Sequence, residues 1–388
     1  MAYGIAESIR EKSSLAEEKT GLVPKDRNPE YWEKYSNHQR VKHQLIHEYL
    51  NGWFAKLGMR SGRILYFDTH AGKGKHASGD LGSPLVAMTT LLQHRFWQSH
   101  FSTCEIRFFF IDEDPSNAAV LRREITALGA LPSNVTAEVI EGDCFRVLDG
   151  IVGHLREKGQ IMAPAFVFVD PYGFKIPGET LRRLMEFRRV ELFINVMWHE
   201  LNWSFAHAVG DQPGSWPDTL NSIFGSDEWR SLVPLQGEDR AEGAIELFRK
   251  LTDAKWATRI RMLGRNNATR YFLVHFTNHE TGRDLMKACV WKVCPEGGFL
   301  VRLTDDARQP YLITPEPNLV PLRQWVIDRL GTSPRRWKSL IEDVRPEIWI
   351  ERHLNQVIRD LKATEKIGAR GYQGRCVPSS NPELFLLK

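Results

Sequence analysis

At residues Ile64–His76 the chain reads ILYFDTHAGKGKH. An apolar run ends in an acidic residue, Asp68, and then passes into a loop with two glycines, Gly72 and Gly74. A buried parallel strand ends in this way where a ligand approaches the backbone, because glycine has no Cβ and permits positive φ. A lone Gly-x-Gly is common in α/β proteins, so the fold prediction depends on the runs that follow.

Three further apolar runs also end in acid: Phe108–Asp112, Val139–Asp143 and Phe166–Asp170. Helical patterns separate these runs, and such alternation predicts a parallel sheet with helices on both faces. The carboxyl ends of parallel strands meet at one edge, so the acids should line one crevice. We therefore predict an α/β, Rossmann-like fold with a mainly parallel sheet and helices on both faces.

The chain divides into three predicted parts. Residues 1–30 are polar and read as an arm, and residues 31–313 form the Rossmann-like domain. Within that domain, residues 197–265 break the β-α rhythm and are interpreted as an insertion that covers the crevice. Residues 318–388 hold three helical patterns and a glycine-rich hairpin, which predict a winged helix-turn-helix domain.

The helical spacing of the apolar residues between Tyr31 and Leu57 predicts a helix packed on the sheet. Arg40 and Lys42 are interpreted as its solvated face, although both could reach a phosphate. His43 and His47 have a metal-ligand spacing, but no third ligand is in view, so an exposed helix face is favoured.

Composition points to a cytoplasmic protein that binds no metal. The five cysteines form no Cys-x-x-Cys pair, and no apolar run approaches the roughly 20 residues that span a bilayer. Residues 318–388 hold 13 Lys and Arg against 8 Asp and Glu, whereas the rest of the chain is nearly balanced. A local basic excess favours nucleic acid as partner, with a solvated helical face as the alternative.

The third helix of the tail is the predicted recognition helix. Its outward polar residues, with one residue of the hairpin, form the predicted nucleic-acid site: Arg352, Asn355, Gln356, Arg359, Lys362 and Arg370. Many winged helices contact only proteins, so that alternative stays open.

The loop after the first strand favours a sulfonium cofactor over a dinucleotide. A dinucleotide fingerprint needs a third glycine, and position 77 is Ala77. The Asp68 carboxylate would repel a pyrophosphate, whereas it would attract the cationic methionine half of S-adenosylmethionine. Asp112 could then accept the ribose hydroxyls, and Asp143 the adenine amino group. The predicted cofactor-binding residues are Asp68, His70, Ala71, Gly72, Gly74, Ser83, Asp112, Glu113, Asp143 and Cys144.

For each of these acids taken alone, capping of the next helix is an equally good interpretation.

The predicted catalytic turn consists of Asp170, Pro171, Tyr172 and Gly173. In amino-group methyl transfer such a turn holds the acceptor nitrogen through its carboxylate and a backbone carbonyl, while the aromatic ring stacks on the base. The alternative is a plain tight turn.

The chain resembles the three-Cys-motif partner family over roughly residues 30–295. The matching segments are Lys42–Tyr49, Asp68–Pro84, Phe110–Asp112, Asp170–Gly173, Ile223–Gly225 with Trp229, and Tyr271–His279. The resemblance implies a class I methyltransferase fold, a C-terminal winged helix and a radical-enzyme-like partner protein with a three-cysteine motif. Asp170–Gly173 also resembles the motif of tRNA guanine-N2 dimethyltransferases and, more loosely, the Asp-Pro-Pro-Tyr of amino methyltransferases.

The sequence thus predicts an S-adenosylmethionine-dependent methyltransferase that acts on a nucleic-acid base, at an exocyclic amino group. One alternative is methylation of a small metabolite or of a product of the radical-enzyme-like partner. Another is a non-catalytic nucleic-acid-binding protein of a defence or regulatory system.

Overall fold

The structure is a computed structural model that describes residues 35–97, 101–208, 215–264, 266–295, 298–302 and 316–387. The predicted arm at residues 1–30 lies outside the described residues. Within the described part of the chain, no helix has both the length and the apolar character needed to cross a membrane.

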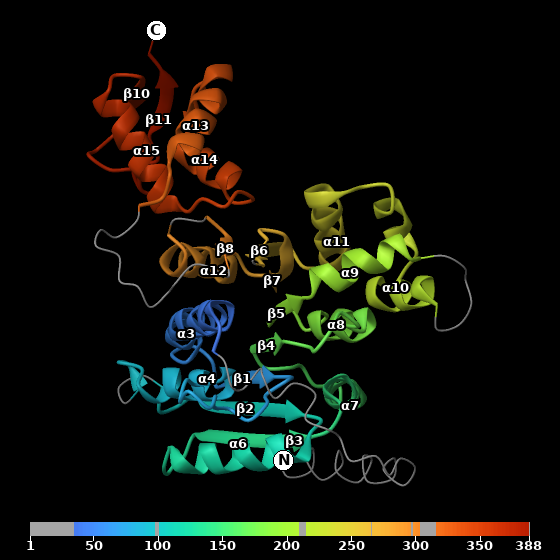
Figure 1. Cartoon of the computed structure of the whole chain (residues 1–388). Coiled ribbons are helices and arrows are strands. Elements are labelled where there is room, and N and C mark those ends of the chain that lie inside the picture. The colour runs from blue at the N-terminus through green and yellow to red at the C-terminus, as the bar shows by residue number, and fades with distance from the viewer. Residues whose placement is uncertain are drawn as a thin grey trace. The chain divides into compact units, whose positions relative to one another are not determined.

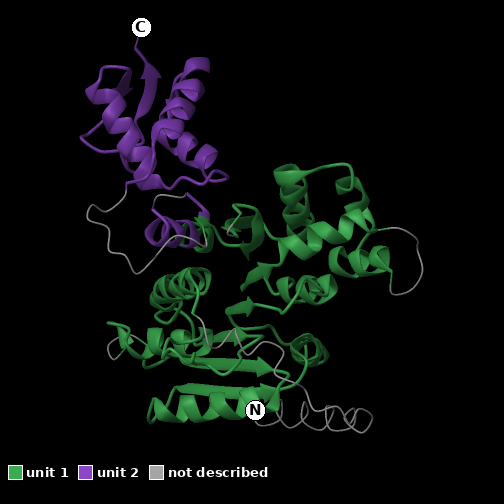
Figure 2. Cartoon of the chain, viewed as in Figure 1, with its two compact units in different colours: residues 1–285, 301–308 green, residues 286–300, 309–388 purple. Residues whose placement is uncertain are grey.

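The chain forms two compact units (Figure 2). The first holds Met1–Leu285 and Val301–Arg308, and the second holds Met286–Leu300 and Gln309–Lys388. The sequence predicted a boundary near residue 313, whereas the structure places Met286–Leu300, which precede that boundary, in the second unit. The reason is Trp291, which stacks on Trp349 and donates a 2.8 Å hydrogen bond to the backbone oxygen of Ile348.

The first unit is built on an eight-stranded sheet in the order β3-β2-β1-β4-β5-β7-β6-β8 (Figure 1). The first five strands pair in parallel, and β7 is antiparallel to both β5 and β6. The strands are β1 Arg63–Asp68, β2 Glu105–Asp112, β3 Val135–Glu141, β4 Ala165–Val169, β5 Val190–Val196, β6 Trp256–Leu263, β7 Thr269–Thr277 and β8 Leu300–Arg302. The chain order reverses between β1 and β4, and open α/β sheets bind ligands beyond the carboxyl ends at such a point.

Helices cover both faces of this sheet. They are α3 Asn37–Leu57, α4 Ser83–Leu92, α6 Pro115–Ala127, α7 Cys144–Glu157, α8 Gly178–Met185, α9 Trp198–Ala206, α10 Trp216–Phe224, α11 Gly237–Leu251 and α12 Glu280–Val293. Side chains alternate along β1, so that Phe67 joins the core under α7, α8, α10 and α11, while Tyr66 stacks with Phe166 on the α3 side. The predicted α/β, Rossmann-like fold with a mainly parallel sheet is confirmed.

Residues 197–265, expected as an insertion over the crevice, differ from that expectation in two ways. The strand β6 lies inside this range and belongs to the sheet. The helices α10 and α11 bury Ile223 and Phe248 in the core beneath the sheet, so they extend the helical layer. Of the described residues in this range, Met197 and Glu200 at the start of α9 line the cavity described below.

A buried carboxylate fixes α3 across the sheet. Glu191 on β5 accepts hydrogen bonds from the Tyr49 hydroxyl, from Trp53 Nε1 at 3.2 Å and from His275 Nε2 at 2.9 Å. Burial alone would raise the pKa of Glu191, but these donors hold the pKa below its usual range. The anchoring of one half of α3 positions its other half, which carries Lys42, at the carboxyl edge of the sheet.

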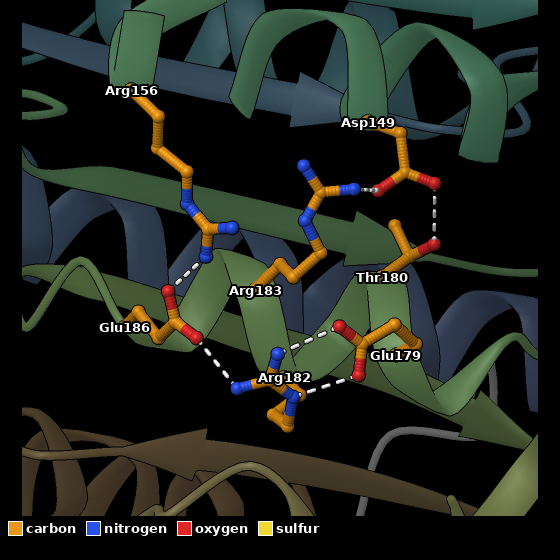
Figure 3. A network of polar contacts seen from close by, with 7 residues as sticks. All are labelled: Asp149, Arg156, Glu179, Thr180, Arg182, Arg183 and Glu186. Carbon is orange, nitrogen blue, oxygen red and sulfur yellow. Dashed lines mark hydrogen bonds and ion pairs between the residues drawn. The ribbon is translucent and has the colours of Figure 1, made fainter. Parts of the chain in front are cut away.

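A second polar network joins α7 to α8 at the surface (Figure 3). Arg182 contacts Glu179 at 2.7 Å and Glu186 at 2.6 Å, and Arg183 contacts Asp149 at 3.0 Å. The remaining members drawn are Arg156 and Thr180. The paired side chains of Arg182, Glu179 and Glu186 are 42%, 61% and 44% exposed, whereas Thr180 is buried. Exposed ion pairs of this kind contribute little to stability because water and salt screen them.

The C-terminal part of the second unit contains three helices and a small sheet. The elements are α13 Val320–Thr332, β9 Arg335–Arg336, α14 Trp337–Val344, α15 Glu351–Ala363, β10 Ile367–Arg370 and β11 Glu383–Leu386. The strands pair antiparallel in the order β10-β11-β9. The three predicted helices and the predicted hairpin are therefore present, and each helix buries an apolar face, with Val326, Leu340 and Leu354 among the buried residues.

Candidate active site

The predicted acids come together at the carboxyl edge of the sheet. Asp68 pairs with Phe110 of β2 and with Phe168 of β4, so Asp112 and Asp170 each lie two residues further along the flanking strands. Asp143 follows β3, the next strand outward. Four strand ends thus place carboxylates around the position where the strand order reverses.

The loop after β1 folds back against β2. Gly72 N donates to Asp112 Oδ2 at 2.7 Å, and Ala71 N donates to the backbone oxygen of Ile111 at 2.9 Å. Gly72 and Gly74 have φ values of 60° and 77°, and a Cβ at Gly74 would lie 2.6 Å from Leu121 Cδ1. Any other residue at position 74 would be strained and crowded. The loop is therefore a tight backbone cradle, which fits the close approach of a nucleoside cofactor.

Asp112 braces this cradle. Besides Gly72, its carboxylate accepts hydrogen bonds from Asp114 N at 3.0 Å and from Asn117 Nδ2 at 3.1 Å. A carboxylate offers about four acceptor positions, so one position remains for a ribose hydroxyl. The next residue, Glu113, is exposed at the same edge.

Asp143 fulfils the alternative interpretation of a helix cap, and its contact with the adenine amino group stays a prediction. Its side chain caps α7 by accepting a hydrogen bond from Arg146 N at 2.9 Å. It is nevertheless exposed at the carboxyl edge, where a cofactor ring could reach it.

Asp68 is completely buried, and its burial raises the pKa to about 7. The Ser83 hydroxyl, the His70 N–H and the Lys42 ammonium lower this pKa, whereas the Asp170 charge raises it. A cation bound nearby would favour the ionised form of Asp68.

His70 and Cys144 form a neutral pair beside the loop. Cys144 Sγ lies 3.7 Å from His70 Nε2, and the other ring nitrogen of His70 lies 2.8 Å from Thr69 Oγ1. Burial raises the pKa of the Cys144 thiol to about 12 and lowers the pKa of His70 to about 4. Neither group is charged near pH 7, so Cys144 is not an activated nucleophile.

A cavity of about 420 Å³ opens beside these strand ends. Three groups of side chains line it: the predicted turn Asp170–Gly173, the first turns of α3, and the start of α9. Ser36 starts α3 with a capping box in which its hydroxyl accepts from Gln39 N and Gln39 Oε1 accepts from Ser36 N. The predicted site residues His70, Ala71 and Ser83 also line the cavity.

A buried ion pair lies in the cavity wall. Lys42 Nζ contacts Asp170 Oδ2, and the two side chains are only 5% and 14% exposed. Asn195 Nδ2 donates to Asp170 Oδ1 at 2.7 Å. Burial would raise the pKa of Asp170, but Lys42 and Asn195 hold the pKa below its usual range, so Asp170 is ionised. The interpretation of Lys42 as a solvated side chain is wrong, because α3 turns it inward to this carboxylate.

Two oxygens of the cavity residues accept no hydrogen bond from the described part of the chain. They are Asn195 Oδ1 and Glu200 Oε2, and both are buried. A buried polar atom without a partner costs about 1–3 kcal/mol, so each of these two oxygens calls for a partner such as a bound ligand or a water molecule. Because Asn195 directs its Nδ2 to Asp170, the atom left over is an acceptor. At these two positions the wall presents hydrogen-bond acceptors.

A histidine cluster closes another side of the cavity. The Tyr35 hydroxyl lies 2.8 Å from His43 Nδ1, and the Tyr35 ring packs against His76. Burial, with the charges of Lys42 and His76, lowers the pKa of His43 well below its usual value. The exposed-face interpretation is thus wrong for His43, while His47 is exposed and contacts Thr90. Among the described residues, no three metal-ligating side chains are grouped to hold an ion.

The predicted catalytic turn has the geometry of a tight turn with an exposed ring. Gly173 N donates to the Pro171 backbone oxygen at 3.0 Å, and Gly173 has a φ of 125° that favours glycine. Tyr172 is 59% exposed at the cavity. Its ring is accessible to a ligand that enters there.

Sequence reasoning missed Lys42, Asn195 and Glu200 as site residues. Asn195 carried a usable signal, because it follows Ile194, the partner of Val169, and so lies opposite Asp170 at the end of an apolar strand. Lys42 carried none, since only the tertiary fold turns α3 toward β4. Glu200 carried no usable signal, because it lies in residues 197–265, where the alternation of strand and helix patterns in the sequence ends.

The predicted nucleic-acid residues separate into two groups. Arg352, Gln356 and Arg359 are exposed along α15, with Arg359 donating to Gln356 Oε1 at 3.0 Å. The others have partners within the second unit: Asn355 accepts from Trp337 Nε1 at 2.8 Å, Lys362 lies 3.2 Å from the Tyr372 ring centroid, and Arg370 pairs with Glu383 at 3.0 Å. Asn355 is therefore a packing residue between α14 and α15 and does not point freely outward.

No protein-family model matches the chain, and no curated protein matches it. Solved structures similar to it include Trm1 from Pyrococcus horikoshii in complex with S-adenosyl-L-methionine, with 15% identity over 68% of this chain and 61% of that chain and a TM-score of 0.36. The putative methyltransferase yhhF from Escherichia coli shows 18% identity over 39% of this chain and 68% of that chain, with a TM-score of 0.25. The methyltransferase domain of bacterial CtHen1 shows 11% identity over 61% of this chain and 99% of that chain, with a TM-score of 0.31. This chain thus spans less than two thirds of the length of Trm1.

Proposed function

We propose that the protein transfers a methyl group from S-adenosylmethionine to an amino group of a nucleic-acid base. The observation that carries this proposal is the set of acceptors in the cavity wall: the ionised Asp170, Asn195 Oδ1 and Glu200 Oε2. A ligand that presents N–H groups would satisfy them, whereas a ligand with only acceptor atoms would not.

The strand ends beside the cavity are suited to the cofactor. When bound, S-adenosylmethionine supplies an electrophilic methyl group carried on a positively charged sulfur. Gly72 and Gly74 allow close backbone approach, and Asp68 provides a carboxylate for the cationic half. The residues proposed to hold the cofactor are Asp68, His70, Ala71, Gly72, Gly74, Ser83, Asp112, Glu113, Asp143 and Cys144.

The chain's own contribution to methyl transfer would be positioning and charge. Asp170 accepts one N–H of the amine, and the Asn195 or Glu200 oxygen accepts the other, which orients the nitrogen lone pair. Lys42 keeps Asp170 ionised, so this carboxylate can stabilise the positive charge that develops on the nitrogen. Tyr172, exposed at the cavity, would stack on the acceptor ring, with Pro171 and Gly173 shaping the turn.

The second unit supports nucleic acid as the acceptor. Its three helices and hairpin are proposed to form a winged helix, with Arg352, Gln356 and Arg359 on the exposed face of α15 as the contact surface. Arg352→Ala and Arg359→Ala should each reduce, by about one, the slope of the logarithm of the binding constant against the logarithm of the salt concentration. Each substitution would remove one phosphate contact.

The test is the incorporation of labelled methyl groups from S-adenosylmethionine into total RNA, total DNA and a small-metabolite extract. We expect an N-methylated nucleoside in a nuclease digest of RNA or DNA. Label in the metabolite extract alone would replace the nucleic-acid acceptor by a small molecule, including a product of a radical-enzyme-like partner. Label in none of the three would contradict the enzymatic proposal.

A further inference from the structure

A cluster of aromatic side chains continues outward from the cavity along α9. Met197 and Glu200 line the cavity, Trp203 follows Glu200 by three residues, and His207 follows Trp203 by four. Residues with these spacings lie on one face of a helix. The same face of α9 therefore leads from the cavity to the surface.

The rings of this cluster are held in fixed positions. Trp203 stacks on His207 with ring centroids 3.7 Å apart and an interplanar angle of 23°, and His207 Nδ1 lies 2.9 Å from the Trp203 backbone oxygen. Trp216 of α10 meets Trp203 edge-on at 5.1 Å, and Phe174 stacks on Trp216 at 6.0 Å. We call these four residues, Phe174, Trp203, His207 and Trp216, the aromatic platform.

The platform is continuous with the catalytic turn. Phe174 directly follows Gly173, so the chain passes from the proposed acceptor-holding turn into the platform without interruption. Trp203 remains 48% exposed although it is ordered by two neighbouring rings, whereas Trp229, further along the chain, is completely buried. An exposed tryptophan in a fixed orientation offers a preorganised flat surface, which binds with little loss of conformational freedom.

We infer that the aromatic platform binds the base next to the acceptor base in a nucleic-acid strand. This inference rests on the proposed function. Every base has a π-face that stacks on aromatic rings without regard to sequence, and the strand would continue from the cavity along α9. Lys175, which is exposed and follows Phe174, is suited to contact the backbone phosphate of that strand.

The experiment compares a mixed-sequence single-stranded 12-mer, as RNA and as DNA, with the free nucleosides as acceptors. Trp203→Ala should raise the KM for the 12-mer roughly tenfold and leave the KM for the nucleoside unchanged, because only the 12-mer has a neighbouring base to stack. Trp203→Phe keeps a ring and should retain most of the affinity. Ile161→Ala is the matched control, since Ile161 is apolar, 84% exposed and precedes β4 at the opposite edge of the sheet.

A 12-mer that carries 5-iodouracil provides a second readout. Irradiation should crosslink it to peptides that contain Trp203 or Trp216, and His207→Ala, which removes the ring stacked on Trp203, should weaken the crosslink while the protein stays folded. If Trp203→Ala leaves the KM for the 12-mer unchanged and the wild-type protein forms no crosslink at Trp203 or Trp216, the platform is refuted while the methyltransferase proposal stands. If the wild-type protein methylates and crosslinks no 12-mer and no nucleoside, both proposals fail.

Discussion

Two polar networks of similar composition serve different purposes in this protein. The Lys42–Asp170–Asn195 group lies buried in a cavity wall, and the α7–α8 network of Arg182 and its neighbours lies at the surface (Figure 3). Removing charges from water costs several kcal/mol per ion, so a buried pair needs compensation from its geometry. A surface pair costs little and contributes little. The buried group therefore calls for a functional explanation, and the exposed group does not.

The largest expected difference between the networks is in stability. Lys42→Met leaves Asp170 buried without its cation and should lower the free energy of unfolding by about 3–5 kcal/mol. The matched variant Arg156→Met breaks the exposed pair with Glu186 and should cost at most about 1 kcal/mol. Urea unfolding of both variants measures the difference.

The double variant Lys42→Met with Asp170→Asn serves as the control, because it removes both charges. It should recover most of the lost stability. Equal losses in Lys42→Met and Arg156→Met would contradict the claim that burial distinguishes the two networks.

The second largest expected difference between the two networks is in methyl-transfer activity. Asn195→Ala removes an acceptor from the cavity wall and should lower kcat/KM for methyl transfer about 10- to 100-fold, with the affinity for S-adenosylmethionine unchanged. Thr180→Ala removes an equivalent hydrogen bond to a carboxylate, Thr180 Oγ1 to Asp149 Oδ2 at 3.0 Å, in the α7–α8 network outside the cavity. Activity should be unaffected by that change; a comparable loss in both variants would remove Asn195 from the site.

Asp68 should give the site a dependence on pH. Its pKa in the folded protein is about 7, raised by burial from 3.8, so the folded state binds more protons than the unfolded state between these values. Stability should therefore fall as pH rises from about 4 to about 7 and stay low above that. At pH 8, Asp68→Asn should raise the free energy of unfolding on the order of 1–4 kcal/mol, and at pH 4 it should change little.

The affinity for S-adenosylmethionine should move in the opposite direction. It should increase between pH 6 and pH 8 in the wild type, because ionised Asp68 attracts the sulfonium. In Asp68→Asn the affinity should be lower, and its pH dependence should be reduced. A wild-type affinity that is flat across this range would remove Asp68 from the cofactor site.

The smallest expected effect lies in the exposed network. Arg182→Ala removes contacts with Glu179 and Glu186 and should lower the free energy of unfolding by about 0.2–1 kcal/mol at low salt. In 1 M salt the loss should nearly vanish, since the Debye length is then about 3 Å. A loss that persists in 1 M salt would show that this network is not simply screened surface charge.

The sequence predicted the sheet and its acidic edge because apolar strands that end in Asp are a local pattern. Asp68, Asp112 and Asp170 were placed correctly by that pattern and by the rule that parallel strands end at one edge. Lys42 was misinterpreted because the inward face of α3 depends on the Glu191 anchor, which joins residues more than 130 positions apart. The strand β6 was missed because its basic residues Arg259 and Arg261 pair with acidic residues of α11, a compensation that no local pattern reveals.

The central claim is that the carboxyl edge of the sheet holds S-adenosylmethionine beside the buried Lys42–Asp170 pair. Calorimetric titration of S-adenosylmethionine into the wild-type protein and into Asp112→Ala tests it most directly. We predict one binding site per chain in the wild type and at least tenfold weaker binding in Asp112→Ala, because the brace of Gly72 and the ribose contact are both lost. Absence of binding to the folded wild-type protein, or equal affinity in the two proteins, would contradict the account.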